Sequence, residues 1–292
     1  MKTILIPIDF SANSINALNY AAALACQVNG KLIVVHILTL PINLLENGVV
    51  VYPEHAVEEV YRIELQELSE NLREKYNLEV ATLCKYGIFL MDLNDLIKSH
   101  KVDLVVMGTK GSSDSLDKLV GSNTFNFIKD AICPVLAIPP EATFSGINHV
   151  TYASDFESEE IIFLQQLFNF AEPFQAKVAI INILTGYELN ILSDEQVIKV
   201  IINYFPQVNH TIIQIKDKNI PEGIHKFMNE NKSDILAIAM HQRNYMEILF
   251  HNNIAKNLIY HISLPLLALP EKPYRKPMQT FKHQEIQNTT VR

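Results

Sequence analysis

Cysteine is scarce in this chain of 292 residues: the three present, Cys26, Cys84 and Cys133, are odd in number and far apart. Such a set differs from the paired cysteines of small disulfide-stabilised secreted domains, and it favours free thiols in a reducing compartment. Cys26 and Cys133 lie within apolar sequence, so we expect both thiols to be buried in a core.

Positive charge is also limited, since 24 lysines and arginines face 32 acidic residues and the net charge is −8. A nucleic-acid partner is therefore not expected, because phosphates need a basic surface. No apolar run approaches the ~20 residues of a membrane helix. The apolar run at residues 4–8 is too short for a signal peptide and is followed by Asp9. We expect a soluble cytoplasmic protein without membrane contact.

What the chain does have is an internal repeat, because four apolar blocks return in the same order. The blocks and their copies are residues 4–10 and 150–156, 31–38 and 177–184, 103–106 and 234–237, and 134–139 and 265–270. The offset falls from 146 to 131 after the second block, which indicates one deletion in a duplicated domain. We expect domains at residues 1–141 and 147–271, followed by a basic polar tail at 272–292. Two alternatives are open for this tail: it is disordered, or it forms an arm that reaches an acidic partner or a sister subunit.

Short apolar runs alternate with helical patterns in each copy. In the first copy the strands are expected near residues 2–8, 31–38, 79–84, 103–107 and 134–138. Ser11 is a suitable N-cap for the first helix, and Gly30 can close it. A second helix at residues 54–76 places Val57, Val60, Tyr61, Leu65, Leu68 and Leu72 on one face. This alternation predicts an α/β fold with a parallel sheet and helices on both faces, in both copies.

The strongest functional signal follows the fourth strand. Gly108 and Gly111 end the apolar run, and nine residues after Gly111 the sequence Gly121-Ser122-Asn123-Thr124 opens a helical segment. Glycines there allow a ligand to approach the backbone or allow positive φ, although ligand-free tight turns are an open alternative. Free N–H groups, hydroxyls and the helix dipole at 121–124 suit an anion, best a phosphate.

These motifs resemble the universal stress protein family in its tandem, two-domain form. The resemblance rests on Gly-x-x-Gly, nine residues and Gly-Ser at 108–122, on Pro7-Ile8-Asp9, on His36-Ile37 and on the closing Cys-Pro-Val-Leu at 133–136. It implies two Rossmann-like domains of the adenine nucleotide alpha hydrolase-like type, each an open five-stranded parallel sheet flanked by helices. It also implies that the closing strands pair within one chain as a pseudo-dimer, and it leaves a homodimer of whole chains open.

The same resemblance implies a site for ATP or another adenine nucleotide, with or without Mg²⁺. The residues implied are Pro7, Asp9, Ile37, Met107, Gly108, Gly111, Gly121, Ser122 and Asn123. Asp9 and Ile37 would line the adenine and ribose pocket, Met107 and Gly108 would flank the ribose, and the remaining glycines, Ser122 and Asn123 would hold phosphates. Capping of the first helix is an open alternative for Asp9.

The second copy lacks this motif. Ala239, Gln242, Asn252 and Asn253 stand at the positions of Gly108, Gly111, Gly121 and Ser122. We therefore expect the ATP-binding motif to operate in the first domain only.

No catalytic set accompanies the site in the sequence. It contains no Gly-x-x-x-x-Gly-Lys-Ser/Thr loop, no recognisable Ser-His-Asp arrangement and no acidic pair with metal geometry beside the glycines. His241, His251 and His261 are ten residues apart, which does not suit neighbours on one helical face. We expect a nucleotide-binding stress-response regulator read by an unidentified protein partner. A slow ATP-hydrolysing enzyme and a ligand-free scaffold are the alternatives.

Overall fold

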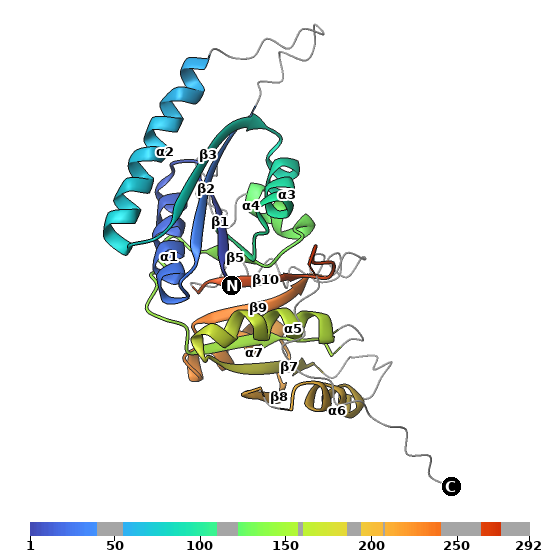
Figure 1. Ribbon diagram of the computed structural model, residues 1–292. Helices are drawn as coiled ribbons and strands as arrows, with labels where there is room; N and C mark the ends of the chain where they lie inside the picture. Colours follow the sequence, from blue (N-terminus) through green and yellow to red (C-terminus); the bar gives the residue numbers. More distant parts are fainter. Residues whose placement is uncertain are drawn as a thin grey trace, which may run out of the picture.

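The computed structural model describes residues 1–39, 55–109, 122–156, 160–185, 194–206, 208–240 and 264–275. Within these residues the chain forms one ten-stranded sheet with helices on both faces (Figure 1). The fold class is α/β, as the alternation of strands and helices predicts.

The elements of the first half follow the expected order closely. They are β1 (Thr3–Pro7), α1 (Ala12–Gln27), β2 (Lys31–Thr39), α2 (His55–Tyr76), β3 (Val80–Gly87), α3 (Phe89–His100), β4 (Leu104–Gly108), α4 (Ser122–Asp130) and β5 (Val135–Ile138). The second half contains β6 (His149–Ala153), α5 (Glu160–Ala171), the 3₁₀ turn η2 (Glu172–Phe174), β7 (Lys177–Leu184), α6 (Asp194–Tyr204), β8 (His210–Lys216), α7 (Ile220–Glu230), β9 (Ile235–Met240) and β10 (Leu266–Pro270). All five strands expected in the first copy are confirmed.

The strand order is β3-β2-β1-β4-β5-β10-β9-β6-β7-β8, so both halves have the same internal order. Neighbouring strands are parallel except at the centre, where β5 and β10 are antiparallel. Leu136 lies opposite Leu267 in this central pair, and Ala137 lies opposite Leu266. The expected pairing of the closing strands is confirmed, and it joins the two five-stranded sheets into one.

The two halves also share fine details of backbone structure. Asp103 accepts hydrogen bonds from the backbone N–H groups of residues 2 and 3, at 2.7 and 3.0 Å. Asp234 does the same for residues 148 and 149, at 2.6 and 2.9 Å. Left-handed residues recur at equivalent positions, namely Phe10 and Phe156, Asn29 and Gln175, and Lys101 and Lys232. Each half therefore fixes its strand starts and turns by the same means.

The start of helix α1 agrees with the prediction from the sequence, whereas its end does not. Ser11 is the N-cap, since its side chain accepts a hydrogen bond from Ser14 N, and this prediction is confirmed. At the other end the left-handed residue is Asn29, with a φ of 51°, and not Gly30. Gly30 instead donates its N–H to Ala25 O at 2.9 Å. Gly30 therefore satisfies a helix carbonyl without the left-handed conformation of a glycine cap.

Two expectations about buried side chains are wrong. Val57 and Val60 of α2 are 46% and 54% exposed, whereas Leu65 and Leu72 are buried. Val60 lies roughly 110° around the helix from the centre of the buried stripe, at about 100° per residue. Cys26 is exposed as well, because it follows the buried stripe of α1 by one residue, while Cys133 is buried as expected.

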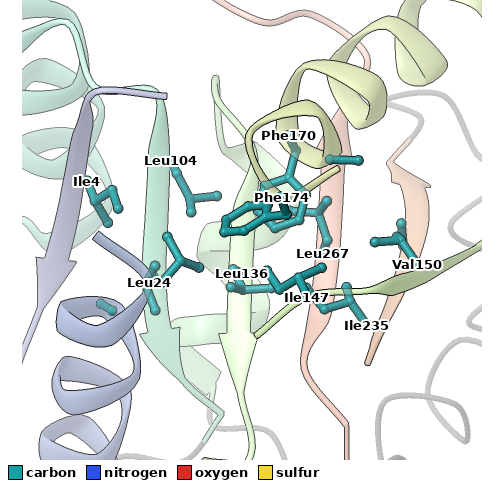
Figure 2. Close-up of a cluster of buried hydrophobic side chains, with 14 of the residues drawn as sticks. Ile4, Leu24, Leu104, Leu136, Ile147, Val150, Phe170, Phe174, Ile235 and Leu267 are labelled. Atoms are coloured by element: carbon teal, nitrogen blue, oxygen red, sulfur yellow. The ribbon is translucent and has the colours of Figure 1, made fainter. Parts of the chain in front are cut away.

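A continuous apolar core connects the two halves. On one face of the sheet it lies under α1, α2, α5 and α6, and on the other under α3, α4 and α7. Figure 2 shows its central part, where Leu136 of β5 and Leu267 of β10 lie among Ile147, Phe170 and Phe174. The junction between the halves is thus part of one apolar cluster that contains residues of both.

The connection between the halves packs against α1. Asn16 Nδ2 donates to Pro139 O and Ala142 O, both at 3.1 Å, and the rings of Tyr20 and Phe144 meet edge to face at 5.2 Å. Burial raises the pKa of the Tyr20 hydroxyl. Further along the chain, at the start of the expected tail, Tyr274 OH donates to Val102 O at 2.9 Å, and Arg275 pairs with Asp103 at 3.3 Å. Residues 272–275 therefore lie against the first half.

Candidate functional site

Three neighbouring parallel strands end at one edge of the first half of the sheet. Pro7 lies opposite Val35 of β2, and Ile8 N donates to Val35 O at 2.8 Å, so Asp9 emerges near the level of Ile37. Strand β4, which ends in Met107 and Gly108, pairs with the other side of β1. The structure thus brings Pro7, Asp9, Ile37, Met107 and Gly108 to the same edge, where parallel sheets bind ligands.

Asp9 is held by the turn that leads into α1. Its Oδ1 accepts from Ser11 N at 3.1 Å and from Ser11 Oγ at 2.6 Å, and its own N–H donates to Ser14 Oγ at 3.3 Å. Ser11 is the N-cap, so Asp9 supports the cap without being the cap itself. These bonds fix the orientation of a partly exposed carboxylate at the strand edge.

Gly108 is required by packing against α1. A Cβ atom at Gly108 would lie 2.7 Å from Asn13 Nδ2, closer than such atoms approach, and 3.0 Å from the backbone oxygen of Asn13, which is a tight contact. Gly108 does not have a positive φ. The predicted alternative that Gly108 is needed for a positive φ is therefore wrong. The other predicted role, close approach of a neighbouring group to its backbone, is retained. Asn13 itself carried no signal in the sequence.

Thr124 ties the start of α4 to the end of β4. Its Oγ1, buried in the first turn, donates to Gly108 O at 2.8 Å. Ser122 and Asn123, the first residues of α4, consequently lie close to Gly108. Asn123 is exposed, and Met107 is buried at 3% exposure. Gly111 and Gly121 lie outside the described residues, as does the side chain of Ser122.

His36 connects the ends of β1 and β2. Its Nδ1 lies 2.8 Å from Ile8 O, and because a carbonyl only accepts, Nδ1 carries the proton. The ring contacts those of Phe10 and Tyr61, with centroids 5.1 and 4.4 Å away. This buried arrangement positions Ile37, the next residue, at the edge.

The corresponding edge of the second half contains a buried acid that sequence reasoning missed. Glu160 stands at the position of Ser14 and is 4% exposed. It accepts hydrogen bonds from Tyr152 OH at 2.9 Å and from Ser154 Oγ at 2.5 Å. Burial, followed by the charge of Glu160, raises the pKa of Tyr152 well above its ordinary value. The only sequence signal was an acid in the first helical turn.

The described part of the chain shows neither a metal centre nor a membrane-spanning helix. No group of three or more His, Cys, Asp or Glu side chains there is arranged to hold a metal ion. His241, His251 and His261 lie outside it. No described helix is both long and apolar enough to cross a membrane.

The structure is that of an α/β protein whose first half has strand ends of the kind at which parallel sheets bind ligands. Comparisons with known proteins identify its family. The universal stress protein family matches residues 1–139. Universal stress protein A homolog 1 of Coxiella burnetii is 31% identical over 148 residues, which are 47% of this chain and 95% of that protein. Universal stress protein YxiE of Bacillus subtilis is 27% identical over 142 residues, 46% of this chain and 96% of that protein. The chain belongs to the universal stress protein family.

Solved structures extend the likeness of the fold to both halves. A universal stress protein from Archaeoglobus fulgidus superposes with a TM-score of 0.67 at 16% identity, covering 92% of this chain and 96% of that one. A functionally unknown protein from Pseudomonas aeruginosa gives a TM-score of 0.61 at 12% identity, covering 92% of each chain. The two-half architecture is therefore a fold that other proteins share.

Proposed function

We propose that the first half binds ATP or another adenine nucleotide at the edge formed by β2, β1 and β4, and that protein partners read the bound state. The observation that carries the proposal is the convergence of Asp9, Ile37 and Gly108 beside the first turn of α4. The spacing of Gly111, Gly121 and Ser122 in the sequence adds backbone N–H groups suited to phosphates. Asp9 suits ribose hydroxyls, and Ile37 offers an apolar wall for a base.

The proposal places the nucleotide in the first half alone. In the second half the glycines are replaced, and Glu160 adds a buried carboxylate at the equivalent edge. The proposed domains are residues 1–141 and 147–271, with the basic tail at 272–292. A homodimer of whole chains belongs to the same proposal.

Calorimetry with purified protein tests this proposal through stoichiometry. We expect one adenine nucleotide per chain, because one half retains the motif and the other does not. Mass spectrometry of nucleotide released from denatured protein identifies the ligand. Two equivalent sites per chain would contradict the single-site proposal, and an absence of any binding would favour the ligand-free scaffold.

An assay of ATP turnover distinguishes a protein that only binds the nucleotide from one that hydrolyses it. The sequence contains no recognised catalytic motif, so we expect bound ATP to remain intact when Mg²⁺ is present. Release of phosphate in repeated turnovers, abolished together with binding by a change at Gly121, would favour the slow enzyme instead.

A further inference from the structure

A cavity lies at the opposite end of the sheet from the proposed nucleotide site, in the second half. It measures about 220 Å³ and opens between α7 and the amino-terminal ends of β6, β7 and β8. The lining residues that matter here are Thr151, Lys177, Ala179, Ile213, Phe227 and Ser233. Helix α7 and strands β7 and β8 are labelled in the lower part of Figure 1. The cavity is therefore distinct from the carboxyl-end edge proposed for the nucleotide.

The first half has no matching small side chains at the equivalent places. Leu5, Ile33 and Val102 occupy the three positions there, with exposures of 0%, 3% and 0%. Thr151, Ala179 and Ser233 replace them in the second half. The exchange removes apolar atoms from a packed site and introduces two hydroxyl groups. Such loss of packing is costly unless something else fills the space.

The two hydroxyls form a buried pair on the cavity wall. Thr151 Oγ1 and Ser233 Oγ lie 2.6 Å apart, and the residues are 1% and 6% exposed. Their mutual hydrogen bond uses one O–H, because each hydroxyl has a single proton to donate. The second O–H is available to an acceptor within the cavity, and leaving such a buried donor unmatched costs free energy.

The charge of the lining indicates what kind of acceptor fits. Lys177 and His149 line the cavity together with Asn209 and Asn231, and no lining residue is acidic. The ring of His210 packs against Phe168 on the other face of the sheet, so only its backbone side is turned to the cavity. Ile213 and Phe227 provide an apolar wall. The volume is below the about 300 Å³ at which pockets for drug-sized ligands begin. A small anion with a short apolar chain matches this combination of charge, donor and size.

We propose that this cavity binds a small aliphatic carboxylate. The carboxylate would lie between the Lys177 ammonium and the Thr151–Ser233 hydroxyl pair, and its hydrocarbon part would contact Ile213 and Phe227. The cavity depends on neither the nucleotide site nor Glu160, so it is a separate site on the same chain.

Ligand-observed NMR with butyrate as the probe tests the proposal. The full chain should give a saturable signal, and the neutral isostere butyramide should bind at least tenfold more weakly, since it lacks the charge that Lys177 meets. Ala179→Ile, which restores the residue of the first half, should abolish the signal by filling the cavity. Lys177→Met should weaken butyrate binding at least tenfold, whereas Lys31→Met, at the matching position of the first half, should leave it unchanged.

The test does not depend on the folding of a single variant. Lys177 is exposed, so its replacement should not disturb folding, and thermal melting checks Ala179→Ile. No saturable signal up to about 10 mM butyrate, a range that covers dissociation constants near 1 mM, would overturn the proposal. Equal binding of butyrate and butyramide, or binding unchanged in Lys177→Met, would overturn it too.

Discussion

Gly108 shows how the packing of one residue can explain a motif position. Its missing side chain leaves room for Asn13, whose amide nitrogen would lie 2.7 Å from an added Cβ. A glycine chosen for this reason still leaves the strand end open for close approach of a ligand. The neighbouring glycines, Gly111 and Gly121, have only their spacing in the sequence to support them.

Gly108→Ala should destabilise the protein by about 1–3 kcal/mol, because the added methyl group overpacks a site bounded by backbone. Urea denaturation measures the loss. The double variant Gly108→Ala with Asn13→Ala provides a thermodynamic cycle, and we expect it to recover part of the loss. Additive effects of the two changes would show that the side chain of Asn13 is not the cause, and would leave its backbone oxygen as the atom that the methyl group meets.

Gly121→Val tests the phosphate end of the proposed site. A side chain there should block the approach of phosphates to backbone N–H groups and weaken ATP binding at least tenfold, or about 1.4 kcal/mol. Asn252→Val, at the corresponding position of the second half, is the matched control and should leave affinity unchanged. Undiminished affinity in folded Gly121→Val would place the phosphates elsewhere.

At the scale of elements, side-chain hydrogen bonds at the starts of strands add to the backbone hydrogen bonds between strands. Asp103, just before β4, binds the start of β1, and Asp234, just before β9, binds the start of β6. Each carboxylate satisfies two backbone donors that the sheet itself leaves open. The repetition of this device in both halves indicates that it positions the strands.

Asp103→Ala and Asp234→Ala should each lower the free energy of unfolding by about 1–3 kcal/mol, since two N–H groups lose their acceptor. Asp234→Asn, which retains one acceptor oxygen, should lose less. Guanidinium denaturation curves of the three variants measure the differences. An unchanged midpoint for both alanine variants would mean that water replaces the carboxylates at no cost.

The exposed valines of α2 also belong to this scale. The helical spacing of residues 57–72 identified an apolar face correctly at Leu65 and Leu72. It could not show where along the helix the contact with β3 ends. That depends on the placement of the helix on the sheet, which local periodicity does not contain.

For the whole molecule, the antiparallel pair β5–β10 turns two half-sheets into one body. The apolar cluster on the α1 face runs from Ile4 through Leu136 and Leu267 to Val150 without interruption (Figure 2). A core shared in this way couples the stabilities of the two halves. We therefore expect them to unfold together and not as independent domains.

Leu136 is fully buried at this junction, so Leu136→Ala should lower the free energy of unfolding by about 2–5 kcal/mol. Hydrogen exchange followed by mass spectrometry should show the same loss of protection in β1 and in β6, because both depend on the shared core. Wild-type protection in β6 alongside reduced protection in β1 would instead indicate two units that unfold separately.

The pairing of the closing strands followed from the resemblance to the universal stress protein family. The sequence by itself determined the alternation of strands and helices and the repeated blocks. These features are recorded in local apolar periodicity and in self-similarity, which need no knowledge of distant contacts. It also selected the strand ends at Asp9, Ile37 and Gly108, because ligand edges follow from parallel topology.

Only the tertiary structure decided which side chains meet at those places. Asn13 against Gly108, Glu160 between Tyr152 and Ser154, and the hydroxyl pair of Thr151 and Ser233 join residues from different elements. Whether Cys26 or Val60 is buried likewise depends on how each helix is rotated against the sheet. Burial and contact arise from the packing of whole elements, and a pattern read along one element cannot contain them.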